Sequence, residues 1–285
     1  MINQQIQKVL YFIENNLNNQ LDLDDLARIA GYSKYHFSRC FKLNVGESVI
    51  DYMTRLRLEK SQFKIIQNNS MINVALDIGY ETPNGFNKAF KKIFGTTPTK
   101  YKKLKKDFLN QFQEKLMQIP QEVVLEEKFV VFTREIGDYY ISSKIAWDRL
   151  INDCILKGNF QYEKFYEAEL LGICHDDPTV TKAENIRYDA CVFFNDEITN
   201  FLKKSGLETK KIDGGKYIKG VHFGKCEGSF DSWLALYSWC EQNGYKFRDI
   251  PPFEKYINIL NQDESVEQIT EIYIPVEKKI AKLVL

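Results

Sequence analysis

The sequence contains few of the residues that form metal or disulfide sites. Its 285 residues include only three His, at positions 36, 175 and 222, and six Cys that are irregularly spaced and form no C-x-x-C pair. No His or Cys pairing in the sequence has the spacing of a metal site. We therefore expect no metal and no cofactor, and we interpret the Cys as small, mostly buried apolar residues of a reducing, cytoplasmic environment.

Long apolar runs and common catalytic motifs are also absent. There is no run of 18 apolar residues, so we expect no membrane-spanning helix and no membrane partner. The first residues, MINQQIQKVLYFIENN, have no basic segment followed by an apolar one, and we expect no secretory signal. No G-x-S-x-G, P-loop or Rossmann motif is present, and we predict that the chain is not an enzyme.

The formal net charge is zero, but the charges are distributed unevenly. Residues 1–110 hold 17 Lys and Arg against 10 Asp and Glu, whereas residues 111–285 hold 22 against 29. A basic half beside an acidic half indicates that the first half meets nucleic acid. Chance scatter of charges over solvated surfaces is the alternative. The length and the 44% of apolar residues fit a globular protein of about two domains.

The first hundred residues contain a duplicated pattern. The segment L-A-x-x-A-G-Y at residues 26–32 recurs as V-A-x-x-I-G-Y at residues 74–80, and the aromatic residues that follow also recur. Each copy predicts a helix, a turn at glycine and a second helix, with Ser33 and Thr82 as the N-caps of the second helices. Such a pair is a helix-turn-helix, and its second helix fits the major groove of DNA.

The second helix of each copy has polar side chains on its outward face. Arg can hydrogen-bond guanine and Asn can hydrogen-bond adenine, whereas Lys contacts phosphates. A helical hairpin in the core of any bundle shows a similar pattern, but two copies in the basic half favour DNA binding. The predicted contacts are Tyr35, His36, Ser38, Arg39 and Lys42 in the first copy and Asn84, Gly85, Asn87, Lys88 and Lys91 in the second.

Residues 52–69 lie between the two copies and predict one long helix. A rigid helix of this kind holds two recognition helices about one turn of DNA apart, ~34 Å, on one face of the duplex. A monomer could then read a full site, so dimerisation is not required.

The pattern L-x-x-L-A-x-x-A-G-Y-S-x-x-x-F-S-R-x-F-K-x-x-x-G, with its second copy, resembles the AraC/XylS family of transcription regulators over roughly residues 1–105. The resemblance implies base contacts by Tyr35, Ser38 and Arg39, and by residues 83–85, 87 and 88. Family members often have Arg in place of Lys88 and longer polar side chains at positions 83 and 85. We therefore expect the first helix to set most of the specificity. Most members activate transcription by touching RNA polymerase, which implies the same partner here.

From residue 121 the sequence changes to short β-rich runs. Strands are predicted at residues 123–125, 129–132, 170–174, 188–194, 216–223, 256–260 and 271–276, and helices at about 140–157 and 229–243. The order strand, helix, strand, strand occurs twice, with Trp147 matched to Trp233 and Glu167 matched to Glu254. We therefore predict an α+β domain made of two βαββ repeats, with a groove between its halves.

The predicted groove is rich in aromatic residues and carboxylates. Aromatic faces around a desolvated carboxylate bind cations through cation–π attraction and charge pairing. The alternative is that the aromatic residues are ordinary core and that Glu254 is a surface acid beside two prolines. The candidates are Tyr139, Trp147, Tyr188, Phe223, Trp233, Tyr237, Trp239, Phe253 and Tyr256, with Glu254 and Glu271 as the carboxylates.

Residues 215–276 contain, in order, G-x-Y, F-x-x-W-x-x-L-Y-x-W, G-Y, P-P-F-E-x-Y and E-I-Y-I-P-V. This series resembles the GyrI-like effector-binding domain, which residues 121–196 match more weakly. The whole chain then resembles regulators of the Rob type, in which an AraC-type module precedes a GyrI-like module. In this family an acidic residue in the groove commonly pairs with lipophilic cations. The resemblance gives this role to Glu254, with Glu271 as the second candidate.

Together these observations predict a multidomain protein. We expect an all-α DNA-binding domain with two helix-turn-helix motifs at residues 1–105, a linker at 106–120 and an α+β effector-binding domain at 121–285. The predicted function is regulation of transcription, with activation implied by the resemblance, through double-stranded DNA and a small amphipathic or cationic effector. Two alternatives stay open for the second domain: a protein-interaction module, or a hydrolase of small electrophiles in which Glu254 acts as a base.

Overall fold

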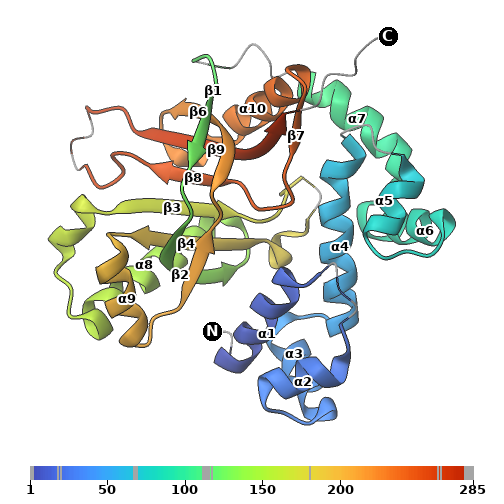
Figure 1. Cartoon of the computed structure of the whole chain (residues 1–285), viewed down its shortest axis with the longest axis horizontal. Coiled ribbons are helices and arrows are strands. Elements are labelled where there is room, and N and C mark those ends of the chain that lie inside the picture. Colours follow the sequence, from blue (N-terminus) through green and yellow to red (C-terminus); the bar gives the residue numbers. More distant parts are fainter. Residues whose placement is uncertain are drawn as a thin grey trace. The chain divides into compact units, whose positions relative to one another are not determined.

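The computed structural model of the protein describes residues 3–17, 19, 21–66, 70–110, 116, 118–179, 181–261, 263 and 265–278, without the side chains of residues 63, 106–110 and 278. The chain divides into two compact units, Met1–Lys105 and Lys106–Leu285, and each is described by itself (Figure 1). Residues 106–110 of the predicted linker continue a helix, whereas residues 111–115 and 117 lie outside the described part.

Helices make up the regular structure of the first unit over its described residues. Two helix-turn-helix pairs, α2–α3 and α5–α6, flank the long helix α4, which confirms the fold class predicted for this half (Figure 1). The connecting helix begins three residues earlier than predicted, and its predicted end, residues 67–69, lies outside the described part. The helices are α1 (Gln4–Asn15), α2 (Leu23–Ala30), α3 (Lys34–Val45), α4 (Val49–Ile66), α5 (Met71–Asp77), α6 (Pro83–Phe94) and α7 (Pro98–Asn110).

Local capping explains where the helices of each pair begin and end. Gly31 ends α2 with a φ of 69°, a left-handed conformation that is costly for a residue with a side chain. The Ser33 hydroxyl accepts a hydrogen bond from His36 N at the start of α3, and Thr82 does the same for Gly85 N at the start of α6. These caps were predicted from the sequence and are confirmed.

The same aromatic stack holds both copies together. Phe41 packs edge-on against Tyr52, with ring centroids 5.5 Å apart, and Phe90 packs in the same way against Tyr101 at 5.6 Å. Phe41 and Phe90 are fully buried. Phe41 lies on α3 and Phe90 on α6, the second helix of each pair. Because each of these helices packs its aromatic face into the core, its opposite face is exposed to solvent.

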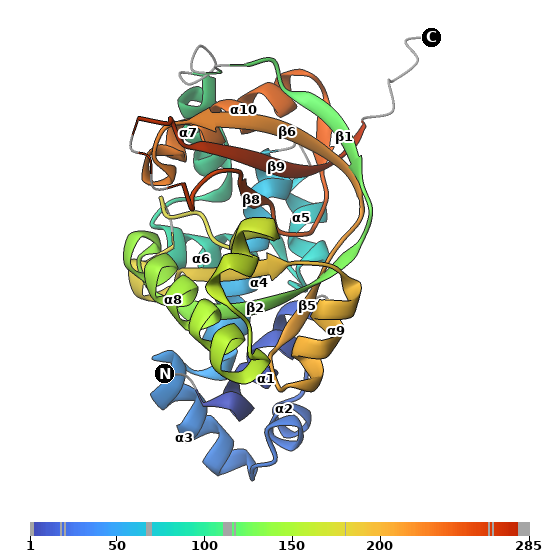
Figure 2. The same ribbon diagram turned by 90° about the vertical axis from the view of Figure 1, so that its left-hand side faces the viewer.

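The second unit is built on one antiparallel sheet, which confirms the predicted α+β fold. Its strands run in the order β1-β6-β9-β8-β3-β4-β2-β5, and β7 pairs with β9. Figure 2 shows how strongly the sheet curls. The strands are β1 (Gln121–Leu125), β2 (Lys128–Ile136), β3 (Glu169–Cys174), β4 (Arg187–Phe193), β5 (Thr209–Ile212), β6 (Gly215–Phe223), β7 (Tyr245–Phe247), β8 (Phe253–Tyr256) and β9 (Ile269–Lys278).

One predicted strand is wrong, and three elements were not predicted. The strand predicted at 256–260 is wrong: β8 ends at Tyr256, and Asn258 then fixes a turn by accepting a hydrogen bond from Ile269 N and donating one to Glu267 O. Strands β5 and β7 and helix α9 (Asp196–Lys204) were not predicted. Both strands are only three or four residues long, too short for a clear alternation of apolar residues.

The helices α8 (Tyr139–Gly158) and α10 (Phe230–Gln242) cover the sheet, each over its own half. α8 packs with Tyr188, Ala190 and Val192 of β4, and α10 packs with Ile272 and Ile274 of β9. These are alternate residues of their strands, so they share one face of the sheet. The residues between them point to the other face, which has its own apolar core.

A single register relates the two βαββ repeats. Gly172 pairs with Ala190 between β3 and β4, and Glu254 pairs with Ile272 between β8 and β9; the two pairs are 82 positions apart (254 − 172 and 272 − 190). The counterpart of Glu254 is therefore Gly172, and the predicted match with Glu167 is wrong. Gly172 and Glu254 also pair directly with each other, where β3 and β8 join the two repeats.

Candidate functional site

The recognition helix α3 presents an aromatic and basic face. Tyr35, His36, Arg39 and Lys42 are exposed, and the side chain of Tyr35 is 74% exposed. The Arg39 guanidinium lies 5.8 Å from the centroid of the Tyr35 ring. Ser38 is half-buried, and its hydroxyl donates to Lys34 O within the helix. The structure thus brings four of the five predicted residues to one open face, with a stacked Arg–Tyr pair that the sequence did not indicate.

The recognition helix α6 is open over most of its predicted contacts. Asn84, Asn87, Lys88 and Lys91 are exposed. Gly85 is half-buried, and a Cβ atom at this position would lie 3.2 Å from the Thr82 hydroxyl that caps the helix. Glycine at this position therefore serves the cap, which the sequence analysis missed.

In the second unit, Glu254 is a buried carboxylate surrounded by neutral donors. It lies on β8 and is only 4% exposed. Its Oε1 accepts hydrogen bonds from Ser229 Oγ at 2.8 Å and from Trp233 Nε1 at 2.7 Å, and its Oε2 accepts one from Tyr256 Oη at 2.8 Å. No Lys, Arg or His among the described residues pairs with it. The arrangement holds a carboxylate without an internal cation.

The hydrogen bonds continue from Glu254 into the other repeat. Tyr256 Oη lies 3.0 Å from Tyr188 Oη, which also accepts from Trp147 Nε1 at 2.9 Å. Burial raises the pKa of both tyrosines well above the usual value, so the hydroxyls stay neutral. Trp147 of α8 and Trp233 of α10 thus both point their indole N–H groups toward this network from their separate helices.

Gly172 makes room for the two tyrosine hydroxyls. A Cβ atom at this position would lie 2.6 Å from Tyr188 Oη and still closer to Tyr256 Oη. Sequence reasoning missed this residue, although a glycine within the apolar run L-L-G-I-C is a recognised sign of a close approach to a strand.

Ser229 was also missed, and its position explains its unusual role. It directly precedes α10, where a serine normally caps the helix, yet it makes no side-chain cap hydrogen bond. Its hydroxyl donates to Glu254 instead. Because β8 comes 25 residues later in the chain, no local pattern indicates this contact.

A cavity of about 330 Å³ opens beside Tyr256. It is lined by residues 165, 166, 168, 170 and 256–261, none of which is charged. Leu170 and Tyr256, which are cross-strand partners, contribute to its wall.

The remaining predicted groove residues fall into two groups. Tyr139 packs edge-on against Tyr188 with centroids 6.2 Å apart, and Tyr237 stacks on Trp233 at 6.0 Å, so both border the network.

Glu271 lies one position away from the partner of Glu254, so it points to the opposite face of the sheet. There it pairs with Lys219 at 2.9 Å and accepts from the Tyr273 hydroxyl at 2.6 Å. Three further candidates do not join Glu254: Phe253 and Phe223, which alternate to the opposite face, and Trp239, which stacks on Tyr245.

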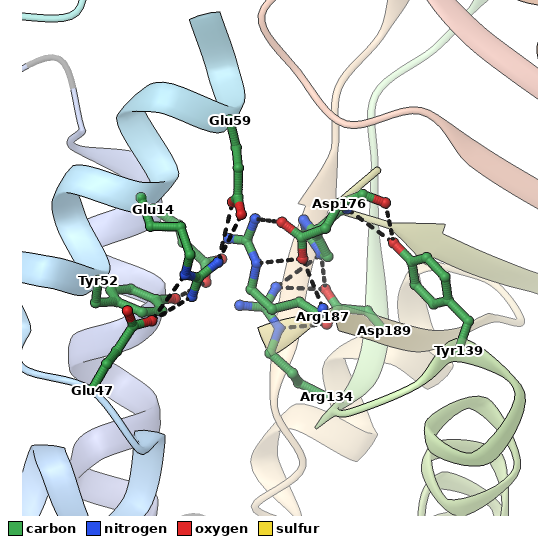
Figure 3. A network of polar contacts seen from close by, with 11 residues as sticks. Glu14, Glu47, Tyr52, Glu59, Arg134, Tyr139, Asp176, Arg187 and Asp189 are labelled. Atoms are coloured by element: carbon green, nitrogen blue, oxygen red, sulfur yellow. Dashed lines mark hydrogen bonds and ion pairs between the residues drawn. The ribbon is translucent and has the colours of Figure 1, made fainter. Parts of the chain in front are cut away.

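Two other buried carboxylates of this unit are paired with cations. Asp189 accepts from Arg134 Nε at 2.6 Å and from Lys210 Nζ at 2.6 Å, and Asp176 is held by Arg187 (Figure 3). Burial opposes their ionisation, but the neighbouring cations hold the pKa of Asp189 well below its usual range and also lower that of Asp176. These two sites are complete within the chain.

The described residues contain no group of three or more His, Cys, Asp or Glu that could hold a metal ion. Over the same part of the chain, no helix has the length and apolar character needed to cross a membrane.

Two family models match the chain. A model described as a GyrI-like small molecule binding domain matches residues 119–277, and one described as a helix-turn-helix domain matches residues 26–104. Among solved structures, the C-terminal domain of EcmrR is 25% identical with a TM-score of 0.44 and covers 57% of this chain and all of that chain. An EcmrR–DNA complex in EcmrR-RPo is 17% identical with a TM-score of 0.43, over 96% of this chain and 95% of that chain.

Curated relatives match about a third of the chain. The Tn10 TetD protein of Escherichia coli is 36% identical over 101 residues, 35% of this chain and 73% of that protein. The transcriptional activator AarP of Providencia stuartii is 35% identical over 34% of this chain and 73% of that protein. The right origin-binding protein of E. coli K12 is 34% identical, and the match covers about a third of either chain. The chain belongs to the GyrI-like family and is an AraC-type transcription regulator that carries a GyrI-like ligand-binding domain.

Proposed function

We propose that this regulator activates transcription, binds double-stranded DNA through α3 and α6, and senses a small cationic or amphipathic molecule at Glu254. The ligand part of the proposal rests on the burial of Glu254 and on its hydrogen-bond donors. Its carboxylate is 4% exposed and accepts three hydrogen bonds from neutral donors, and no cation of the described residues pairs with it.

A buried carboxylate without a counter-charge is unfavourable, because desolvation penalises its charged form. Neutral donors offset part of this penalty, and a ligand cation would offset more. Trp233 and Tyr256 place aromatic rings beside the carboxylate and add cation–π attraction. An anion at the same place would meet like charge. These facts favour a cation as the ligand.

For DNA, the exposed Arg39 and its stacked Tyr35 favour base reading by α3, whereas α6 offers mainly Asn and Lys. Contact with RNA polymerase and activation are further parts of the proposal. They are supported by the relative AarP, which is named as a transcriptional activator, and by the EcmrR–DNA complex, whose name places it in EcmrR-RPo.

Tryptophan fluorescence tests the ligand part, because all three Trp (147, 233 and 239) lie in the second unit. The full chain is titrated with tetraphenylphosphonium, with octanoate as the anion and octanol as the neutral probe. We expect saturable quenching by the cation that Glu254→Gln abolishes. Glu271→Gln is the matched control, since Glu271 lies on the other face of the sheet. Equal cation binding by wild type and Glu254→Gln would overturn the ligand part.

In vitro selection of duplexes by the full chain tests the DNA part. Against the selected site, Arg39→Ala should cost about 1–3 kcal/mol and relax the preference at one base pair. Lys88→Ala should weaken all duplexes alike and reduce the salt dependence by about one phosphate. A uniform loss with Arg39→Ala would show that Arg39 contacts only phosphate.

A further inference from the structure

We infer that Cys40 of helix α3, paired with His36, is a site of covalent modification by small α,β-unsaturated carbonyl compounds, and that the adduct blocks DNA binding. The site lies in the first unit, so Glu254 takes no part in it. Its effect on DNA rests on the proposed function of α3, whereas the reaction of the thiol does not.

The thiol of Cys40 is in contact with a base. His36 lies one helical turn before Cys40, and the Cys40 sulfur is 3.3 Å from His36 Nε2 and 3.9 Å from Nδ1. The Tyr32 ring packs edge-on against the imidazole, with centroids 4.7 Å apart, and holds it in place. A thiol reacts as its thiolate, and a neighbouring imidazole activates it by accepting the proton. Nucleophile and base are therefore within reach of each other.

The other five cysteines lie in the second unit and are held as thiols. Burial raises the pKa of all five, to about 12 for Cys154 and Cys226. Cys226 also donates a hydrogen bond to the Glu227 carboxylate, which stabilises the thiol form. Among the described residues, Cys40 is the one cysteine with an imidazole at hydrogen-bond distance. The other five are Cys154, Cys174, Cys191, Cys226 and Cys240.

The flank of α3 beside Cys40 is open and partly apolar. Leu43 follows Cys40 by three residues, so the two side chains are neighbours on the helix, and Leu43 is 81% exposed. His36 is exposed on the same flank, with the Tyr32 ring beside it. A flat, uncharged molecule can lie on these side chains, and a soft sulfur nucleophile suits a conjugated carbon. These features favour an enone or a quinone as the reactant.

The reaction needs only the chain and the electrophile. The Cys40 sulfur forms a bond to the β-carbon of the conjugated system, and the π electron pair moves to the carbonyl oxygen. His36 takes the thiol proton and returns it, and the proton ends on the α-carbon of the adduct. The product is a thioether, and no group is oxidised or reduced from outside.

An adduct at Cys40 leaves too little space for DNA. An α-helix with its side chains is about 10–12 Å across, and the major groove is about 12 Å wide, so a recognition helix already fills it. Cys40 follows Arg39 directly, within the segment that carries the predicted base contacts. A ring attached to this flank therefore prevents α3 from entering the groove, and bound DNA should in turn shield Cys40.

Labelling of the full chain with N-ethylmaleimide, an uncharged compound of this class, tests the inference. Peptide mass mapping over time should show Cys40 modified at least about tenfold faster than any other cysteine. His36→Gln should slow this labelling about tenfold or more, because the base is lost. His222→Gln is the matched control, since His222 bonds Ser232 and Lys225 O and no thiol.

DNA binding is then measured on the selected duplex, before and after labelling. The labelled wild type should lose binding, whereas Cys40→Ser and Cys40→Ala should bind before and after treatment, and the duplex should protect Cys40. If Cys40 reacts no faster than Cys226, or if His36→Gln reacts like wild type, the modification site is overturned. If labelled wild type still binds the duplex, the block of DNA binding is overturned. If the unlabelled chain selects no duplex, the proposed function fails instead, and the labelling result stands.

Discussion

Asp189 and Glu254 are both buried carboxylates of the same sheet, but the chain treats them in opposite ways. Asp189 is fully buried and is bonded by Arg134, Lys210 and His175. Glu254 is almost as buried, yet its partners are a hydroxyl from Ser229, an indole and a phenol. The first charge is compensated by cations of the protein, whereas the second has only neutral donors among the described residues.

This difference separates a carboxylate paired with internal cations from the carboxylate that we propose as the ligand site. Once a carboxylate is paired with its own cations, removing it leaves those cations buried and uncompensated. A carboxylate that holds only neutral donors can lose its charge without leaving any other charge behind. Burial alone does not separate the two cases, whereas the charge of the partners does.

Neutralising each carboxylate should therefore have unequal effects on stability. Asp189→Asn leaves Arg134 and Lys210 without their counter-charge and should cost about 3–5 kcal/mol of unfolding free energy. Glu254→Gln should change it by less than about 1 kcal/mol, because the amide oxygen can still accept from Ser229 and Trp233, and the Tyr256 hydroxyl can turn to accept from the amide NH2. Urea unfolding followed by tryptophan fluorescence reports on the second unit. Similar losses of unfolding free energy in both variants would contradict the proposed difference between the two carboxylates.

The pH dependence of stability should reveal the Asp189 site. Burial, assisted by Arg134 and Lys210, lowers the pKa of His175 from 6.5 to about 4, so the folded protein keeps this residue neutral. Below pH 6.5 the unfolded chain takes up a proton that the folded chain does not, so stability falls by about 3 kcal/mol between pH 6.5 and 4. His175→Gln should flatten this slope. If the variant keeps the wild-type dependence of unfolding free energy on pH, that dependence comes from other groups.

The lowered pKa values of Asp189 and Asp176 act in the same direction at lower pH. Each contributes stability above its unfolded pKa and loses it as the pH falls through the folded value. The His175→Gln protein should therefore still unfold in acid, because Asp189 and Asp176 lose their contribution to stability at a pH below the range in which His175 titrates.

Filling the space at Gly172 should disrupt the hydrogen bonds around Glu254 and leave the Asp189 site intact. Gly172→Ala places a methyl group against the hydroxyls of Tyr188 and Tyr256, and overpacking of this kind costs about 1–3 kcal/mol. Cation binding should be lost as well, because the Tyr256 hydroxyl that donates to Glu254 is displaced. Gly228→Ala is the control, since its Cβ would approach no atom closer than 3.8 Å. Unchanged cation binding by Gly172→Ala would show that the close approach of residue 172 to the two tyrosine hydroxyls is not needed for binding.

The smallest effect is expected at Ser229. Ser229→Ala removes one of the three donors to Glu254 and should cost about 1 kcal/mol. With less internal compensation of the carboxylate, a cation should bind more tightly, and calorimetric titration can measure this. Ser229→Thr keeps the hydroxyl and should behave as wild type. Weaker cation binding by Ser229→Ala would mean that the serine contacts the ligand itself.

Features fixed by neighbouring residues were predictable from the sequence. Gly31, Ser33 and Thr82 act on the helices next to them, and the repeat made their roles visible twice. The assignment of faces in the sheet was not predictable to the same degree. Glu271 was a candidate because of its type, but the register places Ile272 opposite Glu254, and this shift of one residue turns Glu271 to the other face.

The missed residues share a physical reason. Gly172 and Ser229 matter because β3 and the start of α10 meet β8, and these contacts depend on pairing across 82 and 25 residues of chain. Residue type pointed to Glu254 correctly as a buried carboxylate, but it gave no information on which donors would surround it.

Gly172 and Glu254 hold the same position in the two repeats, and they face each other where β3 meets β8. Were one repeat to assemble as a symmetric dimer, both positions would carry the same residue. Two glutamates would oppose like charges in a buried space, and two glycines would leave no carboxylate. Two copies joined in one chain are free to diverge at this point, so a single buried carboxylate can stand opposite a glycine.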